Sequence, residues 1–287
     1  MARFQTRCLV RPRVYTAIVG VCLFGTSARG QLVGEFDPPR SNCCLVNNAK
    51  SLADQLQDWN QLGRYHQANQ ALKKQPADPA RVVFMGDSIT DFWKLDEYFT
   101  GKPYVNRGIS GQTTPQMLVR MYPDVIDLKP AALVVLAGIN DVSHNTGPST
   151  ADMIEQNLMA MTELAQHHGI KVILCSLLPV SDYPYLRQQS GGGAQAQVAA
   201  RGPGFAPFPR IKMTEGHPPG DILKLNAWIK DYASRVNAIY ADYFTALVDE
   251  KGWLKDADSA DGLHPNAEGY KLMAPIVSAA IQRAMQP

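Results

Sequence analysis

The sequence predicts an α/β protein with a doubly wound, mostly parallel sheet. Two observations support this class. Short, continuous apolar runs recur along the chain, most of them ending near a Gly or Pro, and stretches with helical periodicity lie between them. Strands that are apolar at every position are buried on both faces, as in a parallel sheet that helices cover on both sides. The 287 residues are enough for one large domain of this kind.

Five apolar runs are the expected strands, and three amphipathic stretches are the main expected helices. The strands are expected at 81–85, 103–106, 131–137, 170–177 and 238–243. The helices are expected at 150–168, 220–236 and 266–284.

Two further segments lie outside this alternation. Residues 46–74 have apolar side chains at spacings of three, four or seven, which predicts helix, with Gly63 as a candidate break. Residues 190–219 are rich in Gly, Ala, Gln and Pro. Because a long loop inside a compact domain is either functional or disordered, we expect a flexible insertion that overhangs the site.

The amino-terminal 30 residues have the pattern of a secretory signal peptide. They contain five arginines and no carboxylate, then a short apolar run from Tyr15 to Gly25, then small residues. Cleavage after Ala28 or after Gly30 fits this pattern, and an uncleaved membrane anchor is the alternative. The run is shorter than the ~20 apolar residues of a membrane-spanning helix, so we expect an exported protein, periplasmic or extracellular, without a stable span after cleavage.

The charge balance argues against a nucleic-acid partner. The formal net charge is +2, and removal of residues 1–30 takes away five of the 28 basic residues and none of the 26 acidic ones, which leaves −3. Proteins that bind a phosphate backbone need clustered positive charge, which this chain lacks.

After the predicted signal peptide, we expect residues 31–80 to be a lead-in with a helical segment and 81–287 to be the functional domain.

The cysteines do not indicate a metal site. Cys8 and Cys22 lie in the predicted signal peptide, Cys43 and Cys44 are neighbours, and Cys175 lies in an apolar run that predicts burial. Neighbouring cysteines bond to each other only in a strained ring, so a link from Cys43 or Cys44 to another part of the chain stays open. No Cys-x-x-Cys pair or Cys/His cluster occurs.

Residues with catalytic chemistry follow three of the predicted strands, where ligands of an open parallel sheet bind. Ser88 follows the first strand at a strand-to-helix turn, where its hydroxyl is exposed to a ligand or simply caps the helix. Gly108 follows the second strand, where it supplies a backbone N–H or an ordinary turn. Asn140 follows the third strand and offers an amide donor or an Asx-turn, whereas the adjacent Asp141 is expected to be structural.

A carboxylate and an imidazole lie together just before the last predicted helix. Asp261 and His264 are three residues apart, so the carboxylate can hold one ring nitrogen and leave the other free for a hydroxyl. A capping Asp beside an incidental surface His is the simpler alternative. The combination of hydroxyl, imidazole, carboxylate and two candidate oxyanion donors is nevertheless the complete set that nucleophilic acyl transfer needs.

Four blocks resemble, in order, the motifs of the SGNH, or GDSL-type, hydrolases. The blocks are Gly86-Asp87-Ser88, Gly108, Gly138-x-Asn140-Asp141 and Asp261-x-x-His264. The resemblance covers 81–287, with Ile89 in place of the usual leucine. It implies a flavodoxin-like three-layer α/β/α sandwich with a five-stranded sheet. It also implies Ser88 as nucleophile, Asp261 and His264 as the other triad members, an oxyanion hole of Ser88, Gly108 and Asn140, and no metal or cofactor.

The expected activity is hydrolysis of a carboxylic ester through a serine acyl-enzyme. The run 106–114 is most similar to the branch of platelet-activating-factor acetylhydrolases and secreted carbohydrate acetylesterases, which favours a short acyl ester of a carbohydrate or other small substrate. A lipase or lysophospholipase acting on longer lipid esters is the alternative, with Phe205 and Phe208 lining its groove. A non-catalytic binding protein on the same fold is a third hypothesis. The Gly-x-Ser-x-Gly elbow of α/β-hydrolases and the phosphate-binding loop are both absent from the sequence.

Overall fold

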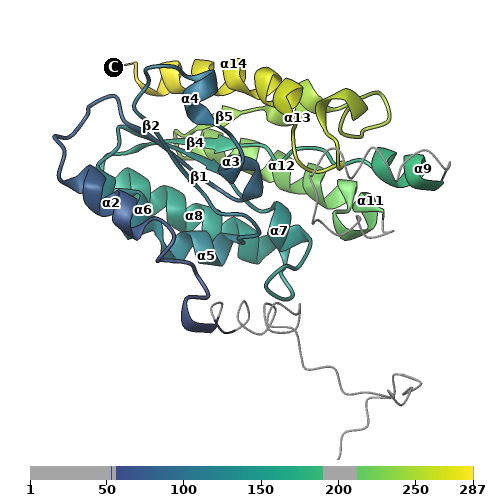
Figure 1. Ribbon diagram of the computed structural model, residues 1–287, viewed down its shortest axis with the longest axis horizontal. Helices are drawn as coiled ribbons and strands as arrows, with labels where there is room; N and C mark the ends of the chain where they lie inside the picture. Colours follow the sequence, from purple (N-terminus) through teal and green to yellow (C-terminus); the bar gives the residue numbers. More distant parts are fainter. Residues whose placement is uncertain (1–52, 54–55, 190–211, 287) are drawn as a thin grey trace, which may run out of the picture. The chain divides into compact units, whose positions relative to one another are not determined.

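The computed structural model describes residues 53, 56–189 and 212–286 (Figure 1). The predicted signal peptide, Cys43, Cys44, and the part of the predicted insertion that contains Phe205 and Phe208 lie outside the described residues. Those described from 56 onward belong to one compact unit.

A five-stranded parallel sheet forms the centre of this unit. Its strands are β1 (Val82–Gly86), β2 (Tyr104–Gly108), β3 (Ala132–Leu136), β4 (Lys171–Cys175) and β5 (Ile239–Ala241). They lie in the order β2-β1-β3-β4-β5, and each neighbouring pair is parallel. This order is that of flavodoxin-like doubly wound proteins. The sequence prediction of the sheet is confirmed, with the difference that the described sheet is parallel throughout.

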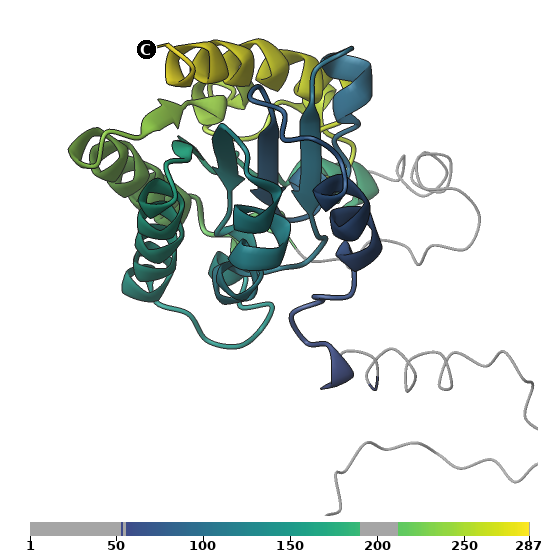
Figure 2. The same ribbon diagram turned by 90° about the vertical axis from the view of Figure 1, so that its left-hand side faces the viewer.

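Helices cover both faces of the sheet. The three long helices are α8 (Ala151–His167), α12 (Pro219–Arg235) and α14 (Ala267–Ala284), each within one residue of the predicted range. Figures 1 and 2 show α14 along one face and α8 and α12 along the other, where α5 (Thr114–Val119) packs beside α8. The protein is therefore a three-layer α/β/α sandwich, as predicted.

The remaining described helices are short and, apart from the one at His66–Lys73, which lies in the predicted helical range 46–74, sequence periodicity did not predict them individually. They are α2 (His66–Lys73), α3 (Ser88–Asp91), α4 (Leu95–Tyr98), α6 (Met121–Asp124), η1 (Ile126–Leu128), α7 (Ile139–Val142), α9 (Tyr183–Gln189), α11 (Met213–Gly216), α13 (Tyr243–Leu247) and η2 (Asp256–Asp258). A helix of four residues spans about one turn, so it has no repeating apolar face to detect. Two of them, α3 and α7, follow β1 and β3 almost directly and begin at the carboxyl edge of the sheet.

The strands and the inward faces of the helices form the hydrophobic core. Every residue of β1 and β3 is buried, which explains why both read as continuous apolar runs. Cys175 at the end of β4 is buried as predicted, and this burial raises the pKa of its thiol to about 12. Cys175 is therefore a packing residue without nucleophilic character at neutral pH.

The helix predicted over 46–74 is only partly correct. Among the described residues, 53, 56 and 57 are helical, a bend and turns over 58–65 surround Gly63, the candidate break, and α2 begins at His66. The side chain of Asp58 accepts hydrogen bonds from the backbone N–H groups of Leu62 and Gly63, both at 2.8 Å. These bonds replace helical ones, and Gln61 takes a left-handed backbone with φ of 55°.

No described helix is long and apolar enough to cross a membrane.

Candidate active site

The turn after β1 positions Ser88 at the carboxyl edge of the sheet. Gly86 permits this turn, because a Cβ there would lie 2.8 Å from the carbonyl oxygen of Leu136 on β3. Asp87, not Ser88, caps α3 by accepting a hydrogen bond from Ile89 N at 2.9 Å. Ser88 is the first residue of α3 and is only 8% exposed. The Ser88 hydroxyl therefore does not cap the helix.

A tight loop before α14 positions Asp261 and His264. Ser259 closes this loop: its hydroxyl donates to the carbonyl oxygen of His264 at 2.8 Å and accepts from Gly262 N at 3.0 Å. Gly262 has a φ of 82°, and a Cβ there would lie 2.2 Å from the carbonyl oxygen of Ser181. Only glycine fits this position, where the loop lies against the segment that follows β4.

The structure brings Ser88, His264 and Asp261 into one hydrogen-bonded row. Ser88 Oγ lies 2.8 Å from His264 Nε2, and His264 Nδ1 lies 2.7 Å from Asp261 Oδ2. Ser88 and His264 are 176 residues apart in the sequence, so the row depends on the whole fold. A carboxylate on Nδ1 places the ring proton there and leaves a lone pair on Nε2, directed at the serine hydroxyl.

The loop keeps the Asp261 carboxylate ionised and fixed in orientation. Burial alone would raise its pKa, but hydrogen bonds and the charge of His264 outweigh burial and lower the pKa to about 2. Asp261 Oδ1 accepts from the backbone N–H groups of Leu263 at 3.0 Å and His264 at 2.8 Å. Since these donors hold Oδ1, Oδ2 is the oxygen that faces the imidazole.

The backbone N–H of Gly108, a predicted oxyanion donor, has another partner in the structure. It donates to the side-chain oxygen Oδ1 of Asn106 at 2.8 Å. A Cβ at Gly108 would lie 2.2 Å from the backbone nitrogen of Asp91, so this glycine serves the close packing of β2 against α3. The prediction for Gly108 is therefore corrected: its N–H is not available to an oxyanion in this structure.

Three other donors are available at this edge. Within the described part of the chain, the backbone N–H groups of Ser88 and Gly111 have no protein acceptor. Asn140 Nδ2 gives one hydrogen to the carbonyl oxygen of Gln112 at 2.9 Å and keeps its second hydrogen. Asn140 Oδ1 accepts from Asn145 Nδ2 at 2.8 Å, which fixes the orientation of the amide. Gly108 and Gly111 could not be told apart as donors from the sequence, because both lie close together at the end of the same strand.

Asp141 has the structural role that was predicted. Its carboxylate accepts from the backbone N–H of Thr114, with Oδ2 at 2.9 Å, and from the hydroxyl of Thr114 at 2.6 Å. It thereby joins α7 to the start of α5. These two helices flank the loop of residues 108–112, so Asp141 supports the edge of the site without facing it.

Asp87 is a buried acid beside the row that the sequence did not single out. Burial raises its pKa to about 7, although the hydrogen bond from Ile89 N and the charge of His264 oppose the shift. Its second oxygen, Oδ2, has no hydrogen-bond partner among the described atoms. Near neutral pH Asp87 therefore carries a proton part of the time, and the negative charge of Asp141 adds to this upward shift of its pKa.

Two rings lie close to the row. Phe92 is 53% exposed, and its ring centroid lies 5.3 Å from that of His264. His217 is buried and its Nδ1 lies 3.2 Å from the carbonyl oxygen of Met213, to which only Nδ1–H can donate. Burial lowers the pKa of His217, and the nearby His264 adds to this shift. His217 is thus a second, neutral imidazole in the neighbourhood of the site.

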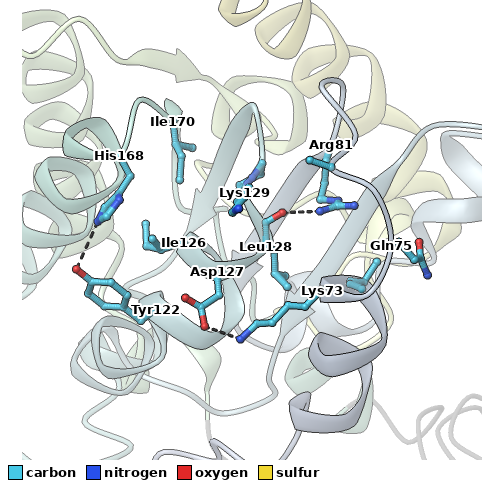
Figure 3. A pocket seen from close by; sticks show the side chains of 13 residues that line it. Lys73, Gln75, Arg81, Tyr122, Ile126, Asp127, Leu128, Lys129, His168 and Ile170 are labelled. Carbon is cyan, nitrogen blue, oxygen red and sulfur yellow. Dashed lines mark hydrogen bonds and ion pairs between the residues drawn. The ribbon is translucent and has the colours of Figure 1, made fainter.

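A separate cavity of about 840 Å³ lies at the opposite edge of the sheet (Figure 3). The cavity is lined by residues that directly precede two of the strands: Arg81 precedes β1 and Ile170 precedes β4. None of Ser88, His264 or Asp261 lines it. No group of three or more His, Cys, Asp or Glu side chains suited to a metal ion occurs in the described part of the chain.

A hydroxyl, an imidazole and a carboxylate in contact at the carboxyl edge of a doubly wound sheet form an arrangement suited to nucleophilic acyl transfer. Residues 84–272 match the model of the GDSL-like lipase/acylhydrolase family. The chain belongs to this family of ester hydrolases, which confirms the resemblance seen in the sequence.

One curated protein is similar to part of this chain in sequence. A protein of Bacillus subtilis (strain 168), the uncharacterized lipoprotein YqeF, is 35% identical over 118 residues, which are 34% of this chain and 49% of the relative. The match thus spans about half the length of that curated relative.

Two solved structures from Bacteroides share the fold. One, from Bacteroides fragilis NCTC 9343, is a protein provisionally assigned as an acylhydrolase; it is 36% identical with a TM-score of 0.66 and covers 80% of this chain and 99% of its own. The other, a GDSL-like lipase from Bacteroides thetaiotaomicron VPI-5482, is 34% identical with a TM-score of 0.63 and covers 79% and 99%.

Proposed function

We propose that this protein hydrolyses carboxylic esters through an acyl-enzyme on Ser88. The observation that carries the proposal is the unbroken row from Asp261 through His264 to Ser88, with contacts of 2.7 and 2.8 Å. Each contact has the length that proton transfer and orientation require. The row supports catalysis rather than binding alone, because a binding protein has no need of an oriented base on its serine.

The reaction follows from the positions of the donors and acceptors. Ser88 Oγ attacks the acyl carbon while His264 Nε2 takes the hydroxyl proton, and Asp261 stabilises the imidazolium that forms. His264 then gives the proton to the alcohol oxygen as its bond to the acyl carbon breaks. Water attacks the acyl-enzyme in the same way, and the carboxylic acid leaves with Ser88 restored.

The oxyanion of the tetrahedral intermediate needs preorganised donors. We assign this role to the N–H groups of Ser88 and Gly111 and to the free hydrogen of Asn140 Nδ2. Support for Gly111 is that its N–H has no acceptor among the residues that the structure describes, and that Asn140 donates to the carbonyl of the next residue, Gln112. Asn145 Nδ2 also approaches the Gly111 carbonyl at 3.4 Å.

The substrate we propose is a short acyl ester, such as an acetyl ester of a carbohydrate or another small alcohol. The sequence branch supports a short acyl group. The exposed ring of Phe92 beside His264 supports a sugar-like alcohol, because an aromatic face packs well on the apolar face of a sugar ring. The protein is proposed to act outside the cytoplasm, which the pattern of residues 1–30 and the lipoprotein relative both support.

A series of p-nitrophenyl esters from acetate to palmitate tests this proposal, with Ser88→Ala as the control. We expect the highest kcat/KM on acetate and no hydrolysis above background in the variant. Activity that rises with chain length would replace the short-acyl proposal with a lipase or lysophospholipase. Folded protein that hydrolyses none of the esters would overturn the catalytic proposal and favour the binding protein.

A further inference from the structure

A segment that precedes the part of the chain matched by the family lies against the loop beside Ser88. The family match begins at residue 84, whereas residues 59–69 contact residues 106–112, which are the end of β2 and the loop that follows it and include the proposed donor Gly111. We call residues 59–69 the amino-terminal brace. Its contacts with the loop are polar and specific, and most of them are shielded from water.

The first contact is made by Tyr65. Its hydroxyl donates to the carbonyl oxygen of Gly108 at 2.5 Å. The guanidinium of Arg107 stacks on the same ring, 4.6 Å from the ring centroid. Tyr65 therefore holds the last two residues of β2, from which the loop starts, one through its hydroxyl and the other through its ring.

The second contact leads directly to a proposed oxyanion donor. The side chain of Gln112 is fully buried and donates from Nε2 to the carbonyl oxygen of Asn60 in the brace at 2.9 Å. Its Oε1 accepts from Arg120 Nε at 2.6 Å. The backbone carbonyl of the same Gln112 accepts from Asn140 Nδ2 at 2.9 Å. One residue thus links the brace to the amide of Asn140.

The third contact is a buried network around Asn69. Asn69 Nδ2 donates to Asp124 Oδ1 at 2.6 Å, and Asn69 Oδ1 accepts from Arg107 Nε at 2.9 Å. Arg120 pairs with the other oxygen of Asp124 at 2.9 Å and donates to the carbonyl oxygen of Gly86 at 3.1 Å. The network therefore joins the brace, the loop and the turn that carries Ser88. Beyond the brace, Lys73 pairs with Asp127 of η1 (Figure 3), which fastens the end of α2.

From these contacts we infer that the amino-terminal brace is a positioning element of the oxyanion hole, with Tyr65 and Asn60 holding the loop that presents Gly111 and orients Asn140. This inference rests on the proposed function. The brace contacts described above are made with residues 106–112, so the brace acts by limiting the movement of the donors. Because displacement of an oxyanion donor weakens transition-state stabilisation more than substrate binding, loss of a brace contact lowers kcat and leaves KM nearly unchanged.

Tyr65→Phe in the full-length chain tests the inference, since it removes one hydroxyl and keeps the ring on Arg107. The matched control is Tyr98→Phe, which removes a tyrosine hydroxyl that donates to the carbonyl oxygen of Ala267 at 3.2 Å, away from the loop. We expect Tyr65→Phe to lower kcat on p-nitrophenyl acetate about five- to tenfold, the scale of one hydrogen bond, with KM within about twofold. Tyr98→Phe should leave kcat unchanged.

Two further readouts separate positioning from general stability. Binding of an alkyl boronic acid, which forms a tetrahedral adduct with an activated serine, should weaken in Tyr65→Phe by the same factor as kcat. Amide hydrogen exchange over residues 106–112 should become faster in Tyr65→Phe and in Gln112→Met, but not in Tyr98→Phe. Unchanged exchange and unchanged kcat in Tyr65→Phe, with Ser88→Ala inactive, would overturn the inference and leave the esterase proposal intact. If the wild type hydrolyses no ester, the exchange data alone decide whether the brace orders the loop.

Discussion

Replacement of Asp261 by asparagine should disable the enzyme through the orientation of one amide. Two backbone N–H groups, those of Leu263 and His264, donate to Asp261 Oδ1 at 3.0 and 2.8 Å. In Asp261→Asn these donors select the amide oxygen at this position, so the amide NH₂ faces His264 Nδ1. The ring proton must then move to Nε2, which donates to Ser88 and cannot act as its base.

The magnitude follows from the cost of the opposite orientation. Turning the amide to restore the active tautomer places its NH₂ group against the two backbone N–H donors. This loses two hydrogen bonds of about 1 kcal/mol each, so the active orientation is populated at roughly one part in 30. The imidazolium of the transition state also loses the adjacent negative charge. Together these effects should lower kcat by about 10³ to 10⁴, the scale seen when a triad carboxylate becomes an amide.

The assay is kcat/KM on p-nitrophenyl acetate between pH 5 and pH 9. The matched control is Asp256→Asn, which neutralises a half-exposed carboxylate of the same segment that pairs with Arg187 at the surface. We expect the control to keep wild-type activity. An Asp261→Asn enzyme with more than about a tenth of wild-type activity would refute the orientation argument, because even the flipped amide alone predicts a larger loss.

Three more predictions concern the residues around the row. Asn140→Ala should lower kcat at least about hundredfold with KM little changed in steady-state kinetics, and a loss confined to KM would contradict its role as an oxyanion donor. The pKa of Asp87 is about 7 in the folded protein and 3.8 in the unfolded chain. Between these two pH values the folded protein retains a proton that the unfolded chain releases, so the free energy of unfolding falls as the pH rises. Asp87→Asn should therefore raise the free energy of unfolding at pH 8 by at most about 4 kcal/mol, measured in urea titrations. An unchanged free energy of unfolding would show that ionised Asp87 does not destabilise the folded protein. Gly108→Ala, whose Cβ would meet the Asp91 backbone at 2.2 Å, should lose about 1–3 kcal/mol in the same titrations, and wild-type stability would contradict the close packing.

The sequence was sufficient for the sheet, the long helices and the three residues of the row. Buried parallel strands produce continuous apolar runs, and their carboxyl ends must meet at one edge, so Ser88 and Asn140 could be placed together from the sequence alone. Asp261 and His264 could be paired because three residues of a tight loop bring their side chains into contact.

The choice between Gly108 and Gly111 could not be made from the sequence. It depends on which amide the side chain of Asn106 engages, and that contact forms only when the turn packs on α3. The contacts of the brace with residues 106–112 could not be predicted from the sequence either. Its apolar spacing predicted a helix, but the Asp58 side chain forms a turn there, and the polar partners of Tyr65 and Asn60 lie more than 40 residues away. Local patterns contain no information on such pairings.

Labelling with a fluorophosphonate, followed by peptide mapping of the labelled site, tests the central claim most directly. The reagent reacts with a serine that a neighbouring base activates, so the row of Asp261, His264 and Ser88 predicts rapid labelling at Ser88 alone. Ser88→Ala should not be labelled, and His264→Ala should be labelled at least about hundredfold more slowly. Labelling at another residue, or equal labelling of wild type and His264→Ala, would contradict the account.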